Sequence, residues 1–112
     1  MKDPFKPYIQ SLQADLSRGN ASEHTHRLTL KTLLESLGER LTATNEPRQV
    51  TDCGKPDIAV YHGPVLLGYL ETKDVGVSLD AEEKSPQLKR YREALPNLIL
   101  TDYLEFRWYV NV

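Results

Sequence analysis

Two acids and one lysine in the middle of the chain have the side-chain types that hydrolysis of a phosphodiester requires: Asp57, Glu71 and Lys73. This reaction needs an activated water and positive charge near the phosphoryl oxygens, which proteins commonly supply with carboxylate-bound Mg²⁺ and a nearby cation. Glu71 and Lys73 are two positions apart, so on a β-strand they project from the same face. We therefore predict a metal-dependent phosphodiesterase site, provided that the fold brings Asp57 to that face.

The segments that carry these residues have the pattern of a β-hairpin. The apolar runs at 57–61 and 65–73 flank a His-Gly-Pro sequence at 62–64, whose glycine and proline suit a tight reversal. Such a turn places Asp57 opposite residues 69–71. The second run is apolar on both faces until it ends in two opposite charges, which is unusual for a purely structural strand. The charges therefore indicate a function, and a surface ion pair is the alternative.

Helical spacing of apolar residues and good capping residues predict three helices, over 7–17, 22–37 and 85–95. The second helix is expected to end at Gly38, with this glycine in the left-handed backbone conformation. Ser85 is a good N-cap for the third helix, and Pro86 suits its first position. Residues 74–84, between the hairpin and this helix, are expected to form a loop.

Further strands complete the expected fold. The β-branched and short polar residues at 41–51 predict a strand that is bent at Pro47. Two more strand-like runs follow the last helix on either side of 101–103, with Phe106 and Trp108 expected in the core. The order helix, helix, three strands, helix and two strands predicts a mixed α/β (α+β) domain around a central sheet.

Size and composition bound the class of protein. A chain of 112 residues with 39% hydrophobic and 27% charged residues suits one globular domain. It has no apolar run long enough for a membrane span and no signal peptide, so a cytoplasmic location is expected. Its single cysteine, Cys53, excludes an internal disulfide and is interpreted as a small hydrophobe.

The charge of the chain does not by itself indicate a nucleic-acid partner. The formal net charge is −2, whereas binding to phosphates usually leaves a basic surface on the domain. Positive charge does gather locally, because four basic residues and no acidic one lie within 84–92: Lys84, Lys89, Arg90 and Arg92. These residues indicate either a DNA-binding surface or a solvated helix face.

A family resemblance lies in the hairpin sequence GKPDIAVYHGPVLLGYLETKD, residues 54–74. It resembles the catalytic hairpin of the PD-(D/E)xK nucleases, with Pro56-Asp57 and Glu71-Thr72-Lys73 as the motif. Residues 23–112 resemble the N-terminal nuclease domain of single-polypeptide (type ISP) restriction–modification enzymes. This resemblance divides the chain into an N-terminal helical extension, 1–20, and a nuclease domain, 21–112, expected to begin a longer protein.

The resemblance implies a restriction-endonuclease-like αβββαβ core, with an extra N-terminal helix and a C-terminal strand. It implies that Asp57, Glu71 and the carbonyl of Thr72 bind one or two Mg²⁺ ions, for which Mn²⁺ can substitute. Lys73 would orient the attacking water, and the products would carry 5′-phosphate and 3′-hydroxyl ends. Double-stranded DNA is the implied substrate, with a helicase-like ATPase and an adenine methyltransferase as further domains of the full-length protein.

Two residues of the third predicted helix form a second candidate motif. Gln87 and Tyr91 are four apart and therefore lie on one helix face. They match the Gln-x-x-x-Tyr motif of several branches of the superfamily, in which the pair lines the active cleft. Tyr91 also fits the apolar stripe, so packing is an equal interpretation for it, whereas for Gln87 a functional role is favoured.

Other polar residues allow two interpretations each. Glu23 extends the core-facing stripe of the second helix, where many relatives place a metal-facing glutamate; it also fits a capping box with Asn20. His24 and His26 point in different directions on a helix, which favours surface or phosphate contacts over a shared metal. Glu46 is either a cleft residue or a turn residue.

The sequence thus favours a Mg²⁺-dependent DNA endonuclease domain of a restriction–modification enzyme. One alternative is a stand-alone nuclease of the resolvase or repair type. Another is a non-catalytic DNA-binding or assembly module with the same fold, which the negative net charge favours and the intact Asp57, Glu71 and Lys73 set opposes.

Overall fold

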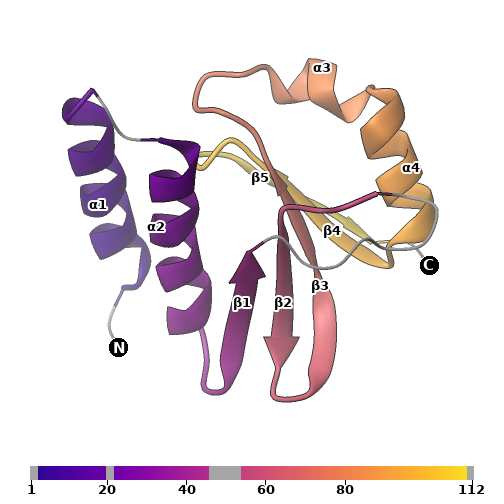
Figure 1. The fold of residues 1–112 in the computed structure, drawn as a ribbon, viewed down its shortest axis with the longest axis horizontal. Coiled ribbons are helices and arrows are strands. Elements are labelled where there is room, and N and C mark those ends of the chain that lie inside the picture. The colour runs from indigo at the N-terminus through magenta and orange to yellow at the C-terminus, as the bar shows by residue number, and fades with distance from the viewer. Residues whose placement is uncertain (1–2, 20–21, 46–53, 111–112) are drawn as a thin grey trace.

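A five-stranded sheet flanked by helices forms the molecule (Figure 1). The computed structural model describes residues 3–19, 22–45 and 54–110, apart from the side chain of Glu23. Its elements in chain order are α1 (Phe5–Ser17), α2 (Glu23–Ser36), β1 (Leu41–Asn45), β2 (Ile58–His62), β3 (Val65–Thr72), α3 (Leu79–Glu83), α4 (Pro86–Ala94), β4 (Asn97–Thr101) and β5 (Phe106–Val110). None of the described helices is both long enough and apolar enough to cross a bilayer.

The strands lie side by side in sequence order, and the sheet is mixed. Neighbouring strands are antiparallel except for β3 and β4, which are parallel. A parallel pair needs a crossover, and here α3 and α4 provide it (Figure 1). The predicted hairpin is confirmed as β2 and β3, which reverse at Gly63 and Pro64.

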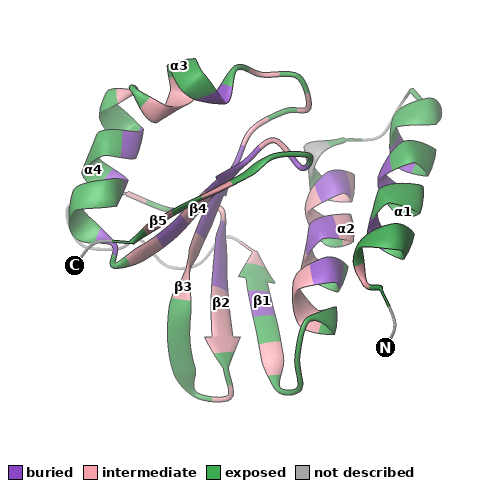
Figure 2. Ribbon diagram, turned by 180° about the vertical axis from the view of Figure 1, so that it is seen from behind, coloured by how far each residue is buried: buried purple, intermediate pink, exposed green. Residues whose placement is uncertain are grey.

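Helices cover both faces of the sheet, over two separate clusters of buried apolar side chains. The first cluster joins α1 and α2 to one face and includes Leu70 of β3. The second joins α3 and α4 to the other face and includes Leu98 and Leu100 of β4. Neighbouring residues of a strand point to opposite faces, so Tyr69 and Leu70 contact different clusters. The buried residues in Figure 2 accordingly follow the middle of the sheet and the inner sides of the helices.

The N-caps explain where two of the helices begin. Ser85 Oγ accepts a hydrogen bond from Leu88 N at 3.1 Å, which confirms the predicted start of α4. In α2 the cap is Ser22, which accepts from Thr25 N at 3.3 Å, so the N-cap is not at position 20 as the capping-box interpretation of Glu23 requires.

Two local predictions fail for reasons of chain geometry. The left-handed residue after α2 is Arg40, with φ 63°, whereas Gly38 does not have a positive φ. Part of the predicted loop 74–84 is the short helix α3, capped by Ser78 and carrying Asp80 in its first turn. Its single buried apolar residue, Leu79, is too weak a periodic signal to predict a helix.

The expectation that Phe106 and Trp108 are core residues is also wrong. Their exposed fractions are 38% and 69%. Both lie on β5, an edge strand, and although the ring of Phe106 lies 6.4 Å from that of Tyr8 on α1, neither side chain is enclosed on all sides. The predicted strand at 41–51 is confirmed as far as Asn45, and its bend at Pro47 lies outside the described residues.

The close contact of β3 and β4 generates a prediction about Gly68. A Cβ atom on Gly68 would lie 2.8 Å from the backbone oxygen of Asn97, so Gly68→Ala must push the two strands apart. We expect a loss of roughly 1–3 kcal/mol in the free energy of unfolding, measured by urea denaturation. The control is Gly38→Ala, whose added methyl would contact only the flexible side chain of Leu41. Equal stability of the two variants would contradict the prediction.

Candidate active site

The β2–β3 hairpin brings Asp57 and Glu71 together, as the sequence predicts. Ile58 pairs with Leu70, so Asp57 lies opposite Glu71 at the same end of the two strands. The backbone N–H of Asp57 donates to Glu71 Oε1 at 3.3 Å. Asp57 Oδ2 accepts from both the N–H and the hydroxyl of Thr72, at 2.8 and 3.0 Å. Backbone and hydroxyl groups of the hairpin thus orient one carboxylate oxygen of Asp57.

Lys73 completes the predicted group. Its Nζ lies 3.8 Å from Glu71 Oε2 and 3.5 Å from Glu82 Oε2. Its backbone N–H donates to Thr101 O of β4 at 2.8 Å, which fixes the peptide plane between Thr72 and Lys73. Because this peptide is trans, the carbonyl of Thr72 points the opposite way, toward the side where Asp57 lies. That direction suits the ligand role expected for this carbonyl.

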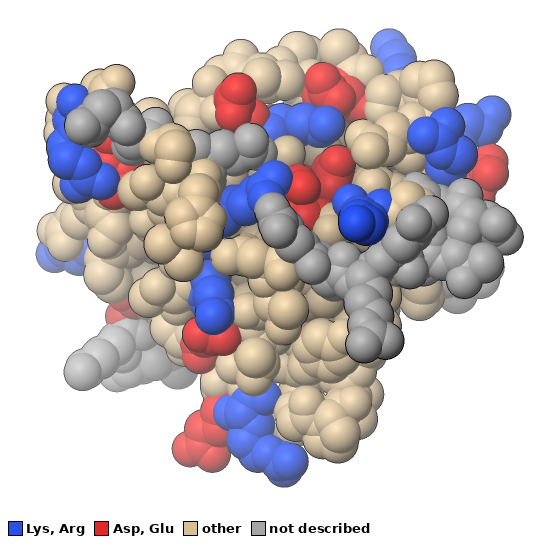
Figure 3. All heavy atoms as spheres, in the orientation of Figure 1, with Lys and Arg blue, Asp and Glu red and all other residues tan. Residues whose placement is uncertain are grey.

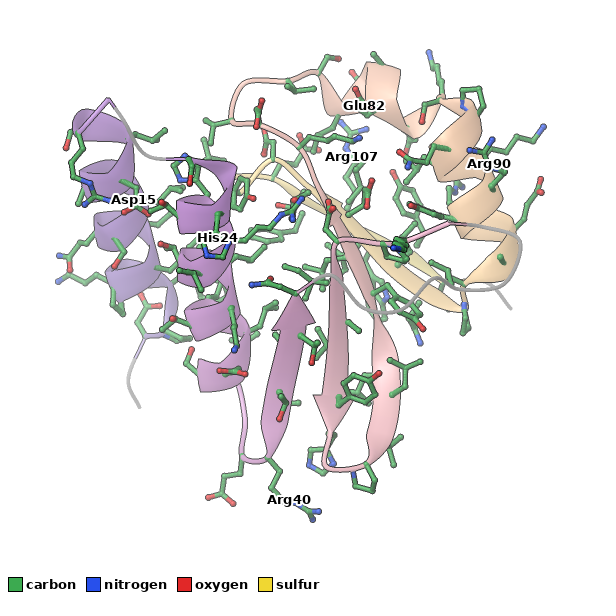
Figure 4. All side chains as sticks on the ribbon, viewed as in Figure 1. Asp15, His24, Arg40, Glu82, Arg90 and Arg107 are labelled. Atoms are coloured by element: carbon green, nitrogen blue, oxygen red, sulfur yellow. The ribbon has the colours of Figure 1, made fainter. Side chains whose placement is uncertain are left out.

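Two charged residues of the site were not predicted from the sequence. Arg27, on α2, donates from Nη2 to Asp57 Oδ1 at 2.8 Å. A signal existed, because Arg27 lies three and seven positions before Leu30 and Leu34, on the core-facing stripe of its helix. Glu82, on α3 (Figure 4), had no such signal, because it falls in the segment that was expected to be a loop.

Burial changes the acidity of Glu71. Its exposed fraction is 5%, and burial, followed by the negative charge of Asp57, raises the pKa of this carboxyl to about 8. The charge of Lys73 acts in the opposite direction but does not cancel the rise. Near pH 7 Glu71 therefore holds a proton unless an additional cation stabilises its ionised form.

The donor set fits a hard divalent cation such as Mg²⁺. Two adjacent carboxyl groups and a main-chain carbonyl supply oxygen atoms, the ligands that Mg²⁺ prefers. Burial, followed by the charge of Asp57, raises the pKa of Glu71, and such a cation would stabilise the ionised carboxylate. Within the described part of the chain no three His, Cys, Asp or Glu side chains form a metal-binding group. Water would therefore supply the remaining ligands, as is common for Mg²⁺.

The charged groups are arranged around this position on one face of the molecule. In the space-filling view of Figure 3, atoms of Asp and Glu near the centre of the face are bordered by atoms of Lys and Arg. Among the described residues, the carboxyl groups of Asp57, Glu71 and Glu82 lie beside two cations, Arg27 and Lys73. The site is therefore acidic when all its carboxyl groups are ionised.

Gln87 and Tyr91 contact each other as their spacing predicts. Gln87 Nε2 donates to the Tyr91 hydroxyl at 3.2 Å. Tyr91 is fully buried in the second core cluster, and a Cβ on Gly54 would lie 3.4 Å from its hydroxyl. Tyr91 thus packs beside Gly54, in the segment that leads into Asp57, and its hydroxyl accepts the hydrogen bond from Gln87.

The remaining candidate residues have separate environments. Lys84, Lys89 and Arg92 line a surface groove of about 780 Å³ together with Trp108 and Tyr109. Arg90 is exposed on α4 and points away from the sheet (Figure 4). Three of the four basic residues predicted to bind DNA therefore line this groove, and Arg90 extends into solvent.

The two histidines of α2 differ in burial. His24 is exposed, whereas His26 is 8% exposed, and its ring lies 5.5 Å from that of Tyr103. A surface role for His26 is thus wrong, because the C-terminal half of the chain covers it. The side chain of Glu23 and the positions of Glu46 and Cys53 lie outside the described residues.

The fold is a restriction-endonuclease-like core, in which helices flank a five-stranded mixed sheet, and this confirms the predicted class. It is similar to a chain in the cryo-EM structure of a DrdV–DNA complex, with a TM-score of 0.75 and 23% sequence identity. The match covers 96% of the present chain and 11% of that chain. At this identity the likeness shows the fold alone. No family model and no curated protein matches the sequence.

The raised pKa of Glu71 predicts how stability depends on pH. The folded protein favours the protonated form of Glu71. Without divalent metal, the stability that this group contributes is therefore fully present below its ordinary pKa of 4.5 and is lost as the pH rises through about 8. Glu71→Gln removes this loss. At pH 9, in EDTA, the variant should be more stable than wild type by roughly 1–3 kcal/mol, and at pH 4.5 about equal to it.

Thermal melts over this pH range check the prediction, with Glu39→Gln at an exposed position as the control. A wild-type stability that rises between pH 6 and pH 9, relative to Glu71→Gln, would contradict the raised pKa.

Proposed function

We propose that this chain is the nuclease domain of a DNA-cutting restriction–modification enzyme and that it has a PD-(D/E)xK site requiring Mg²⁺. The observation that carries the proposal is the juxtaposition of Asp57, Glu71 and Lys73, in which the backbone of Asp57 binds Glu71 at 3.3 Å and Lys73 Nζ lies 3.8 Å from it. The substrate would be double-stranded DNA and the products 5′-phosphate and 3′-hydroxyl ends. The structural neighbour supports this choice, because it belongs to a complex with DNA.

Each residue of the site would have a separate role in hydrolysis. Asp57 and Glu71 present the oxygen atoms that hold the metal, and the two hydrogen bonds from Thr72 orient Asp57. Bound Mg²⁺ would polarise the phosphoryl group and lower the pKa of a bound water. Lys73 would orient the attacking water and stabilise the negative charge that develops on the phosphate. Glu82, 3.5 Å from Lys73 Nζ, holds this ammonium group in place.

The chain would act as one part of a larger protein. It matches 11% of its structural neighbour, which leaves room in a protein of that size for further domains. We propose a helicase-like ATPase and an adenine methyltransferase for this role, with the whole enzyme in the cytoplasm. Phosphate contacts by Lys84, Lys89 and Arg90 would hold the duplex without reading its sequence.

Cleavage depends on Lys73 if the proposed function is correct. Nicking of supercoiled plasmid in 10 mM Mg²⁺ should fall by at least about 100-fold in Lys73→Ala, because the water and the developing charge lose their cation. The matched control is Lys6→Ala, at an exposed position of α1, which should cleave like wild type. A wild-type chain that binds duplex but never nicks it would instead be a non-catalytic DNA-binding module.

Metal binding can be tested without DNA. Because only the folded protein presents the Asp57 and Glu71 oxygens together, 10 mM Mg²⁺ should raise the melting temperature by roughly 2–6 °C. Asp57→Asn keeps the shape of the side chain but loses its charge, so this rise should disappear. An equal rise in wild type and Asp57→Asn would place the metal elsewhere and contradict the proposed site.

A further inference from the structure

Arg27 has an unusual position for a helix arginine. It lies on the core-facing stripe of α2 and reaches across to the hairpin, where Nη2 donates to Asp57 Oδ1 at 2.8 Å. The side chains of Arg27 and Asp57 are only 16% and 18% exposed. Two charges of opposite sign are thus held together in a poorly hydrated place, where either one without a partner would be costly.

The two oxygens of Asp57 are held in different ways. Oδ2 accepts two hydrogen bonds from Thr72, within the hairpin itself. Oδ1 accepts from Arg27, at the end of a long and rotatable side chain. A cation between Asp57 and Glu71 would take the oxygen whose partner is easier to displace, which is Oδ1. Arg27 and the cation therefore compete for the same oxygen.

We infer that Arg27 exchanges partners during the reaction cycle: it neutralises Asp57 in the metal-free protein, and on metal binding it moves to a phosphate of the DNA backbone. The inference rests on the proposed function and adds a residue and a regulatory step to it. The guanidinium that the metal displaces from Asp57 is planar, and its donors match the oxygen atoms of a phosphate. A side-chain rotation suffices, because Arg27 is already partly exposed.

This exchange couples the two ligands of the site. Metal binding makes the phosphate-binding form of Arg27 available, and a phosphate that holds Arg27 frees Asp57 for the metal. Each ligand must then strengthen the binding of the other by the same factor. An arginine that only orients Asp57 would have the opposite effect, because its loss would weaken metal binding.

The first test measures Mg²⁺ binding alone, without DNA, by isothermal titration calorimetry. Arg27→Gln removes the competing charge, so it should bind Mg²⁺ about 3- to 10-fold more tightly than wild type, a modest change for one partly exposed ion pair. The control is Arg18→Gln, which removes an arginine–aspartate pair at the C-terminal end of α1, where Arg18 Nη2 lies 2.7 Å from Asp15 Oδ1, and should leave the affinity unchanged. Arg27→Lys keeps the positive charge and should bind Mg²⁺ like wild type, which guards against misfolding of the first variant.

The second test measures binding to a 20-base-pair duplex by fluorescence anisotropy, with Ca²⁺ as the metal because its looser coordination disfavours cleavage. Ca²⁺ should strengthen duplex binding by about tenfold in wild type and Arg18→Gln, and by less than about twofold in Arg27→Gln. The same gain in wild type and Arg27→Gln would overturn the transfer to phosphate.

The outcomes separate this inference from the proposed function. If wild type binds Mg²⁺ and Arg27→Gln binds it equally well or more weakly, the exchange is overturned and the proposed nuclease site stands. Wild type that binds no Mg²⁺, or binds it no better than Asp57→Asn, overturns the proposed function and the exchange with it.

Discussion

The closeness of two acidic side chains at the end of the β2–β3 hairpin is the constraint on which the rest of the site depends. Asp57 and Glu71 are both shielded from water, and two ionised carboxylates in such a place repel each other. The protein compensates by several means at once. Thr72 donates two hydrogen bonds to Asp57, Arg27 and Lys73 contribute positive charge, and Glu71 keeps its proton up to a pH of about 8.

Three separate parts of the fold position the charged groups around these two acids. The helix α2, on one face of the sheet, brings Arg27, while α3, in the crossover to β4, brings Glu82 to Lys73. The parallel pairing of β3 with β4 fixes the backbone of Lys73 through Thr101. The sheet thus holds the oxygens in a fixed arrangement, whereas the two cations lie on long side chains that can move. That contrast is suited to a site that must admit and release charged ligands.

The likeness to a chain of the DrdV–DNA complex concerns shape, and the function is argued from the site. A fold of this kind can be shared by proteins with different activities, so 96% coverage at 23% identity carries the architecture alone. The site supports the proposed function independently of this likeness. Its paired carboxyl groups, the lysine beside them and the raised pKa of Glu71 all follow from contacts within this chain.

The sequence by itself determined the hairpin, the meeting of Asp57, Glu71 and Lys73, and the start of α4 at Ser85, because strand alternation, a tight turn and a helix cap are local properties. Only the tertiary structure decided that Arg27 and Glu82 complete the site, that His26 is buried and that Trp108 is exposed. These features depend on contacts between segments far apart in the chain. A stripe of apolar residues predicts that a helix face is covered, but what covers it is decided by the packing of the whole domain.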